Sequence, residues 1–269
     1  MSRVVISPEP GTYDVSPVTG TPLMPGDGRK IDVSECFCEA FQGEGAYTGV
    51  PAVFLRLSGC RLGCRWCDTR SVWTVRKTFS IGSLTDIFVN EGLADLLDKG
   101  HHLVVTGGSP LLQQDSLHAF LKMLSGVCRE KPFVEIENEC SVMVSEACSG
   151  LFGLVRCWNC SPKLGDSGVP ERLRYNKEAV CQVVENAEES WFKFVVSSKN
   201  IEQDWNEIDR LFLRPGLVGP EKIILMPQGA CRAELTPEVC RTVAEFAVSR
   251  NVRYGDRLHI NLYDTRKSV

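Results

Sequence analysis

Short runs of apolar and β-branched residues alternate along this chain with longer segments whose apolar positions recur at helical spacing. The runs that predict strands are residues 53–57, 103–106, 133–137, 154–158, 191–196, 222–226 and 257–260. The segments that predict helices are residues 81–99, 111–128, 142–149, 176–188, 201–211 and 237–250. Repeated strand–helix alternation favours parallel strands joined by right-handed crossovers. We therefore expect an α/β fold with mostly parallel strands, either a complete or partial barrel or an open doubly wound sheet.

Glycine and polar residues follow most of the predicted strands. In parallel α/β folds, the loops at the carboxyl ends of the strands bind ligands. We therefore expect the functional site to be built from these loops. They are residues 58–68, 107–108, 138–139, 161–163 and 227–229.

The start of the chain lacks this alternation. Residues 1–30 contain five prolines and four glycines, a density that breaks periodic elements. We interpret residues 1–34 as an N-terminal arm and residues 35–269 as the single domain that carries the site.

Composition and charge exclude several classes of protein. The chain has 269 residues, and its net charge of -4 gives no general attraction to nucleic acid. No apolar run approaches the roughly 18 residues that a membrane span needs, and residues 1–20 lack the apolar core of a secretory signal. We expect a cytoplasmic protein that contacts neither membrane nor nucleic acid directly.

Cysteine content is the one unusual number. The chain contains 13 cysteines, an odd count that argues against a secreted disulfide framework. We expect reduced thiols, some of which bind a metal.

Three of these residues, Cys60, Cys64 and Cys67, are spaced C-x3-C-x2-C on a loop after a predicted strand. A closed zinc site or a fully ligated 4Fe-4S cluster takes four protein ligands. Three therefore favour an iron–sulfur cluster with one iron open to another ligand. The alternatives are buried free thiols or a zinc site completed by a remote cysteine. The remote candidates are Cys36, Cys38, Cys157 and Cys160. The last two are spaced C-x2-C, which could suggest an auxiliary metal or redox site, but we interpret them as buried free thiols.

This triplet, with Trp66 before its last cysteine, resembles the cluster motif of the radical S-adenosylmethionine (radical SAM) superfamily. Residues 104–110, Val-Val-Thr-Gly-Gly-Ser-Pro, resemble the glycine-rich sequence after that superfamily's second strand, usually Gly-Gly-Glu-Pro. Two glycines let the backbone approach a ligand closely. The resemblance implies a partial (β/α) barrel of the radical SAM type, with residues 35–269 as the catalytic domain.

Further segments resemble the 7-carboxy-7-deazaguanine synthase family of that superfamily. The most discriminating are Phe-Gln-Gly-Glu-Gly at residues 41–45 and Cys-Asp-Thr at residues 67–69. The other matching segments are residues 51–60, 134–137, 161–163, 193–196, 226–229 and 257–260.

The family resemblance implies a carbon–nitrogen lyase of a queuosine-type pathway. Such an enzyme converts 6-carboxy-5,6,7,8-tetrahydropterin to 7-carboxy-7-deazaguanine with loss of ammonia. It implies a 4Fe-4S cluster on Cys60, Cys64 and Cys67, with S-adenosylmethionine on the fourth iron as the source of a 5′-deoxyadenosyl radical. Mg2+ would bind at Thr69, since a hydroxyl is a suitable hard-oxygen ligand. The implied partners are an electron donor such as flavodoxin or ferredoxin and a second copy of the chain in a homodimer.

Candidate site residues follow from the same resemblance, position by position. Substrate contacts are expected at Phe41, Gln42, Gly43, Glu44, Arg56, Thr106 and His259. Contacts to S-adenosylmethionine are expected at Trp66, Asp68, Gly108, Ser109, Ser161, Lys163 and Gln228. Arg56 suits a substrate carboxylate because its guanidinium can donate two parallel hydrogen bonds. The alternatives are a solvent-facing Arg56, a structural His259 in a final short strand, and turn-forming loop residues.

Two positions depart from the family pattern. Ser109 stands where the superfamily usually has Glu, so a charge-assisted hydrogen bond to the amino group of the cofactor becomes weaker or water-mediated. We expect looser cofactor binding rather than inactivity. Residues 138–141 read Asn-Glu-Cys-Ser where the family commonly has Thr-Asn-Gly-Thr, and the lost glycine changes the backbone that is allowed there.

Two other functions compete with this one. A glycyl-radical-enzyme activase would share the cysteine triplet, but the segments at residues 41–45 and 67–69 argue against it. A noncatalytic zinc-stabilised binding module would leave the glycine-rich loop after residue 106 without a purpose.

Overall fold

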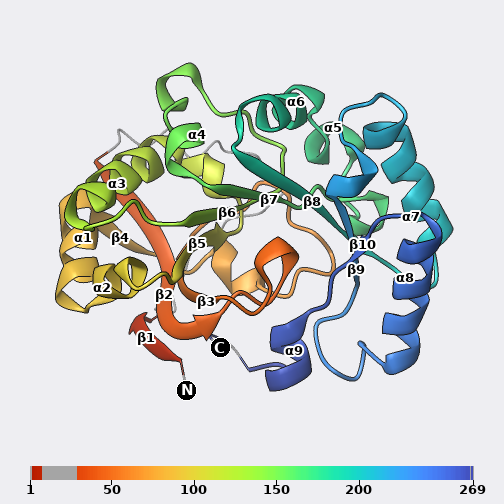
Figure 1. The fold of residues 1–269 in the computed structure, drawn as a ribbon, viewed down its shortest axis with the longest axis horizontal. Helices are drawn as coiled ribbons and strands as arrows, with labels where there is room; N and C mark the ends of the chain where they lie inside the picture. Colours follow the sequence, from red (N-terminus) through yellow and green to blue (C-terminus); the bar gives the residue numbers. More distant parts are fainter. Residues whose placement is uncertain (1, 8–28, 267, 269) are drawn as a thin grey trace.

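The computed structural model describes residues 2–7, 29–266 and 268, which form an α/β fold around one curved sheet (Figure 1). The strands are β1 (Arg3–Ile6), β2 (Lys30–Phe41), β3 (Pro51–Leu57), β4 (Lys77–Ser80), β5 (His102–Gly107), β6 (Val134–Asn138), β7 (Cys157–Cys160), β8 (Glu189–Val196), β9 (Ile223–Pro227) and β10 (Arg253–Tyr254). The helices are α1 (Ile81–Asn90), α2 (Leu93–Asp98), α3 (Gln114–Val127), α4 (Leu151–Leu154), α5 (Glu171–Arg174), α6 (Lys177–Asn186), α7 (Ile201–Ile208), α8 (Pro237–Ser249) and α9 (Leu258–Tyr263). Short 3-10 helices span Gly45–Tyr47, Arg70–Trp73, Pro110–Gln113, Glu146–Cys148, Gly165–Ser167 and Pro220–Lys222, and a π-helical turn spans Asp209–Leu213.

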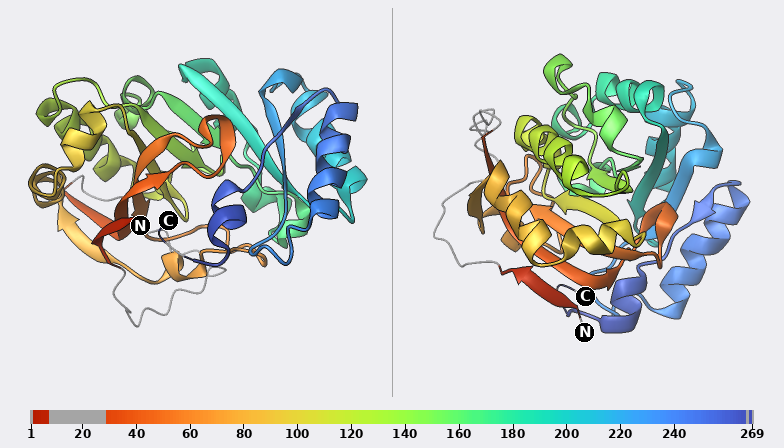
Figure 2. Two further views of the ribbon diagram at one scale, coloured as in Figure 1. Left: turned by 60° about the horizontal axis from the view of Figure 1, so that its bottom comes forward. Right: turned by 60° about the vertical axis from the view of Figure 1, so that its left-hand side comes forward.

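The sheet runs in the order β1-β2-β3-β5-β6-β7-β8-β9-β10, with β4 paired to β2. All pairings from β3 to β10 are parallel, whereas β2 is antiparallel to β1, β3 and β4. The sheet curves, and helices α1 to α8 cover its outer side (Figure 2). This architecture confirms the prediction of a partial (β/α) barrel with mostly parallel strands.

Burial explains why the central strands read as continuous apolar runs rather than alternating ones. All residues of β9 are buried, as are the first five of β5, because parallel strands have one face against helices and the other towards the barrel interior. Helix α3 packs one apolar face onto the sheet through Leu117, Phe120 and Leu124. No helix among the described residues has both the length and the apolar character to cross a membrane.

One predicted strand, residues 257–260, is wrong, because Arg257 is the N-cap of helix α9 and the other three residues begin that helix. A run of four residues is too short for its periodicity to separate strand from helix. The helix is placed by tertiary contacts, since the Leu258 N–H donates to the carbonyl of Gly43 at 3.0 Å. His259 therefore reaches the site from a helix and not from a strand.

The predicted helix at residues 142–149 is also wrong, apart from the 3-10 turn Glu146–Cys148. Side chains from other elements bind the backbone donors that a helix would use. The Val144 N–H donates to Gln182 Oε1 at 2.9 Å, and the Ser145 N–H donates to Gln114 Oε1 at 2.7 Å. Glutamine contacts across the fold thus replace local helical hydrogen bonds.

Other elements differ in their limits. The predicted helix 81–99 divides into α1 and α2 at Gly92, whose φ of 71° is left-handed. The fourth predicted strand, 154–158, lies later, as β7. Of the predicted arm, residue 1 and residues 8–28 lie outside the described residues, while β1 and the start of β2 form part of the sheet.

The buried carboxyl group of Asp204 on α7 provides a test of stability. Asp204 is 3% exposed, and burial raises its pKa to about 6 although the Ser197 N–H donates to it at 2.8 Å. Since the folded-state pKa lies above the ordinary value of 3.8, ionising this group lowers stability as the pH rises through about 6. We expect Asp204→Asn to raise the free energy of unfolding at pH 8 by about 1–2 kcal/mol. Urea denaturation at pH 4 and pH 8 measures this, and an equal gain at both would contradict it.

Candidate functional site

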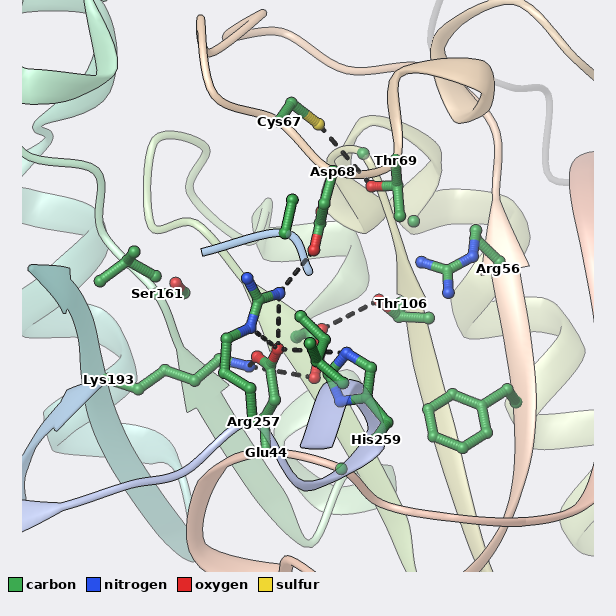
Figure 3. Close-up of a pocket in the computed structure, with 18 of the residues that line it drawn as sticks. Glu44, Arg56, Cys67, Asp68, Thr69, Thr106, Ser161, Lys193, Arg257 and His259 are labelled. Atoms are coloured by element: carbon green, nitrogen blue, oxygen red, sulfur yellow. Dashed lines mark hydrogen bonds and ion pairs between the residues drawn. The ribbon is translucent and has the colours of Figure 1, made fainter. Parts of the chain in front are cut away.

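A cavity at the carboxyl ends of the parallel strands contains nearly all the predicted site residues (Figure 3). Only Ser109 and Gln228 of the predicted set do not line it. The predicted residues that do are Phe41, Gln42, Gly43, Glu44, Arg56, Cys60, Cys64, Trp66, Cys67, Asp68, Thr69, Thr106, Gly108, Ser161, Lys163 and His259. Residues 218 positions apart in the sequence therefore share one cavity, as the loop positions predicted.

The cysteine loop forms one wall of this cavity. Cys60, Cys64 and Cys67 follow β3 and are all free thiols. Burial raises the pKa of Cys60, and it raises that of Cys64 to about 11. A metal that binds here must displace the thiol protons, so its binding is coupled to pH. Thr69 Oγ1 lies 3.7 Å from Cys67 Sγ, and its hydroxyl opens into the same cavity.

Two glycines hold this loop close to the end of β5. A Cβ atom added to Gly108 would lie 2.1 Å from the Gly59 carbonyl oxygen and 2.5 Å from Cys60 Cβ. One added to Gly107, whose φ is 141°, would lie 2.1 Å from the Leu57 carbonyl oxygen. Only glycine permits this approach, and it leaves a cradle of exposed backbone beside the thiols.

The donor set fits a 4Fe-4S cluster better than a zinc ion. None of the remote candidates for a fourth zinc ligand, Cys36, Cys38, Cys157 and Cys160, lines the cavity. Among residues 2–7, 29–266 and 268, no three His, Cys, Asp or Glu side chains meet closely enough to bind a single ion. A cubane cluster places its cysteines on different irons, so it needs three thiols around a cavity and not at one point.

A chain of buried ion pairs crosses the floor of the cavity (Figure 3). Glu44 accepts from Lys193 Nζ at 2.7 Å and from Arg257 Nε at 3.0 Å. Arg257 Nη2 also pairs with Asp68 at 2.5 Å, and Lys193 also pairs with Glu137 at 3.2 Å. These pairs join two loops, strands β6 and β8, and the start of α9.

These contacts set the charges in the cavity. Burial alone would raise the pKa of Glu44, but the positive charges of Lys193 and Arg257 outweigh it and hold that pKa well below its usual range. Burial would likewise lower the pKa of Lys193, but the carboxylates of Glu137 and Glu44 raise it. All three groups are therefore charged at neutral pH.

His259 differs from these groups because burial lowers its pKa, and this effect exceeds the attraction of Glu44. Its Nε2 lies 3.9 Å from Glu44 Oε1. The imidazole is thus neutral near pH 7 and can accept one hydrogen bond. A Cβ added to Gly43 would lie 2.3 Å from His259 Nδ1, so the glycine allows α9 to pack against this loop.

The remaining predicted substrate contacts are fixed by buried or half-buried acidic residues. Arg56 Nε donates to Glu35 at 2.7 Å, and the Thr106 hydroxyl donates to Glu137 at 3.0 Å. Gln42 is 1% exposed. Its amide donates to the buried Glu135, which also binds His102 and Asn159.

The predicted cofactor contacts lie on the side of the cavity nearest the cysteines. Lys163 Nζ donates to Ser161 Oγ at 2.8 Å and lies 5.8 Å from the centre of the Trp66 ring. Ser109 is instead 1% exposed, with its Oγ 3.9 Å from Cys60 Sγ and accepting from the Arg61 N–H at 3.2 Å. Gln228 is half-buried after β9, where its N–H donates to the carbonyl of Val196.

Sequence reasoning gave no role to Lys193, Arg257 or Glu137, although all three line the cavity. Lys193 had a usable signal, because it is a cation within an otherwise apolar strand run. The matching segments 134–137 and 257–260 contain Glu137 and Arg257, but nothing local to either residue indicates a partner in a distant part of the chain.

Comparisons with known proteins agree with this geometry. Residues 41–139 match the model of the 4Fe-4S single cluster domain family. The chain is 33% identical over 234 residues to 7-carboxy-7-deazaguanine synthase from Pyrobaculum aerophilum, covering 86% of this chain and 94% of that protein. It is 30% identical to the enzyme of the same name from Rhodopirellula baltica, covering 95% and 97% of the two chains. The crystal structure of QueE from Escherichia coli matches with a TM-score of 0.59 at 23% identity, over 86% of this chain and 95% of that one, and has the same fold.

Proposed function

Because the chain belongs to the 7-carboxy-7-deazaguanine synthase family, we propose that it converts 6-carboxy-5,6,7,8-tetrahydropterin to 7-carboxy-7-deazaguanine and ammonia. It is a radical SAM enzyme that uses a 4Fe-4S cluster and S-adenosylmethionine. The observation that supports the substrate assignment is that the cysteine wall and the predicted pterin contacts line one cavity.

Cys60, Cys64 and Cys67 hold the cluster in this proposal. When bound and reduced, the cluster supplies the electron that cleaves the sulfonium of S-adenosylmethionine and yields the radical that abstracts hydrogen from the pterin. Trp66, Asp68, Gly108, Ser161 and Lys163 hold the cofactor on the cysteine side. Magnesium takes the Thr69 hydroxyl as one of its oxygen ligands.

The chain orients the pterin with other groups that line the same cavity. Arg56 pairs with the substrate carboxylate. Gln42 and the Gly43 backbone bind the edge of the pterin ring, and Phe41 covers its face. Neutral His259, Thr106 and Glu44 complete the polar contacts, and the fixed charges of Lys193 and Arg257 keep Glu44 ionised.

The proposal includes the wider setting of the enzyme. It acts as a cytoplasmic homodimer, reduced by a flavodoxin- or ferredoxin-type donor, and does not bind nucleic acid directly. Support for a reducing compartment comes from the 13 cysteines, all of which lie in the described part of the chain and are free.

An anaerobic assay tests this function. Reconstituted, reduced protein is incubated with S-adenosylmethionine, Mg2+ and the carboxytetrahydropterin, and chromatography measures 5′-deoxyadenosine and 7-carboxy-7-deazaguanine. Both products are expected. If 5′-deoxyadenosine forms without the deazapurine, the substrate assignment is rejected while the superfamily stands.

Arg56→Gln tests the binding of the substrate carboxylate. We expect KM for the pterin to rise about 10- to 100-fold, because a hydrogen bond between charged groups contributes roughly 1.5–3 kcal/mol. The affinity for S-adenosylmethionine should stay within about twofold, since Arg56 pairs with Glu35 and not with any of the predicted cofactor contacts. An unchanged KM would remove Arg56 from the proposed site.

A further inference from the structure

Glu139 is a buried carboxyl group with one oxygen unused. It follows β6 directly, is 5% exposed, and accepts from the Ser141 hydroxyl at 2.7 Å through Oε1. Within the described part of the chain, Oε2 has no hydrogen-bond partner. Leaving a buried acceptor unsatisfied costs about 1–3 kcal/mol, and more for a charged one. Such a group in a cavity indicates a partner from outside the chain.

Glu139 lies among the residues that are predicted to contact the cofactor. Strand β6 lies between β5, which leads into Gly108, and β7, which leads into Ser161. The Ser161 N–H donates to the carbonyl of Asn138 at 2.7 Å, so Glu139 is adjacent to that loop. Glu139, Gly108 and Ser161 all line the cavity with the cysteines.

The charges around Glu139 point the same way. The loop that carries Glu139 is held against the cysteine loop, because Arg61 Nη1 donates to the Ser141 carbonyl at 3.4 Å. The nearby cations are used elsewhere, because Lys163 binds Ser161 and Arg61 donates to the Ser141 carbonyl. The unpaired oxygen of Glu139, a residue that lines the cavity, therefore suits an amine or a cation.

The backbone after Glu139 holds this orientation. Cys140 adopts a left-handed φ of 58°, and its N–H donates to Asn138 Oδ1 at 3.1 Å. Cys140 thus holds a left-handed backbone conformation that a glycine adopts without strain. A non-glycine residue held this way, at a cost of about 1–2 kcal/mol, is typical of functional loops.

Two departures from the family sequence then have one explanation. Ser109 replaces the usual glutamate of the glycine-rich loop and does not line the cavity. Glu139 places a carboxyl group on the next strand of the sheet, where the family commonly has asparagine. The negative charge lost from the loop after β5 is restored by the loop after β6.

We propose that Glu139 binds the amino group of S-adenosylmethionine, replacing the carboxylate that the superfamily usually carries at position 109. Its Oε2 accepts a charge-assisted hydrogen bond, while Ser141 fixes the other oxygen. The proposal rests on S-adenosylmethionine as the cofactor and not on the pterin substrate. A negative result in its test would therefore leave the proposed reaction intact, and failure of the proposed reaction would leave the role of Glu139 intact.

Equilibrium binding of S-adenosylmethionine to the cluster-loaded protein tests this. Glu139→Gln keeps the oxygen that accepts from Ser141 but removes the negative charge. Glu139→Asn introduces the residue that is common in the family. If one variant fails to fold, the other still tests the proposal. We expect the Kd to rise about 10- to 100-fold in both variants. Iron content and the visible spectrum should match those of the unchanged protein.

Two controls locate the effect. Asp204→Asn neutralises another buried carboxyl group outside the cavity and should leave the Kd within about twofold. A cofactor analogue with a carbonyl in place of the amino group should bind Glu139→Gln and the unchanged protein equally. An unaltered Kd for S-adenosylmethionine in both variants, or an equal loss for the analogue, would overturn the proposal.

Discussion

Gly108→Ala should leave the protein unable to hold a full cluster and should weaken binding of S-adenosylmethionine more than 100-fold. The added methyl group would lie 2.1 Å from the Gly59 carbonyl oxygen and 2.5 Å from Cys60 Cβ. Both neighbours are anchored to the cysteine loop, so neither can move without displacing Cys60. The Ser109 N–H would also lose its 3.0 Å hydrogen bond to Gly59.

The destabilisation of Gly108→Ala should be about 3 kcal/mol, at the upper end for overpacked sites, because the clash is with backbone. Iron analysis, the visible spectrum and thermal unfolding of the apoprotein measure these effects separately. Gly126→Ala is the matched control, since nothing lies within 4 Å of its added methyl group. That change should stabilise α3 by about 0.5–1 kcal/mol. Full iron content in Gly108→Ala would contradict the close approach.

Lys193→Met should lower the free energy of unfolding by about 3–5 kcal/mol at pH 7, the range for removing one partner of a buried ion pair. Lys193 is 3% exposed and lies between Glu44 and Glu137. Methionine replaces the unbranched apolar stem but leaves the two carboxylates without the cation between them. Arg129→Met, which removes a largely exposed cation that pairs with Asp95 and Asp98, should cost less than about 1 kcal/mol.

The effect of Lys193→Met should depend on pH. The folded-state pKa of Glu44 lies below its ordinary value of 4.5, so its ion pairs add stability above that pH and lose it as the pH falls through the folded-state pKa. Without Lys193, protonation of the carboxylates relieves their repulsion. The penalty should therefore shrink between pH 7 and pH 4, and a penalty that is constant over this range would contradict the assignment.

The loops that form the site could be predicted, but their partners could not. The cysteine triplet and the glycine pair are local patterns whose chemistry depends on spacing alone, and both line the cavity. Arg257 offers no comparable signal, because its partners Glu44 and Asp68 lie 213 and 189 residues away. Ser109 matches a motif position by sequence, yet its hydroxyl faces Cys60.

By itself, the sequence determined the strand–helix alternation, the parallel sheet and the edge of that sheet at which the site lies. These follow from side-chain periodicity and from the rule that crossovers place successive loops on one edge. Only the tertiary structure decided that residues 258–260 are helical, that Lys193 and Arg257 join the cavity loops, and that the Glu139 carboxyl group has an unpaired buried oxygen. Hydrogen bonds and ion pairs between distant segments set these features, and such contacts leave no periodic trace in the chain.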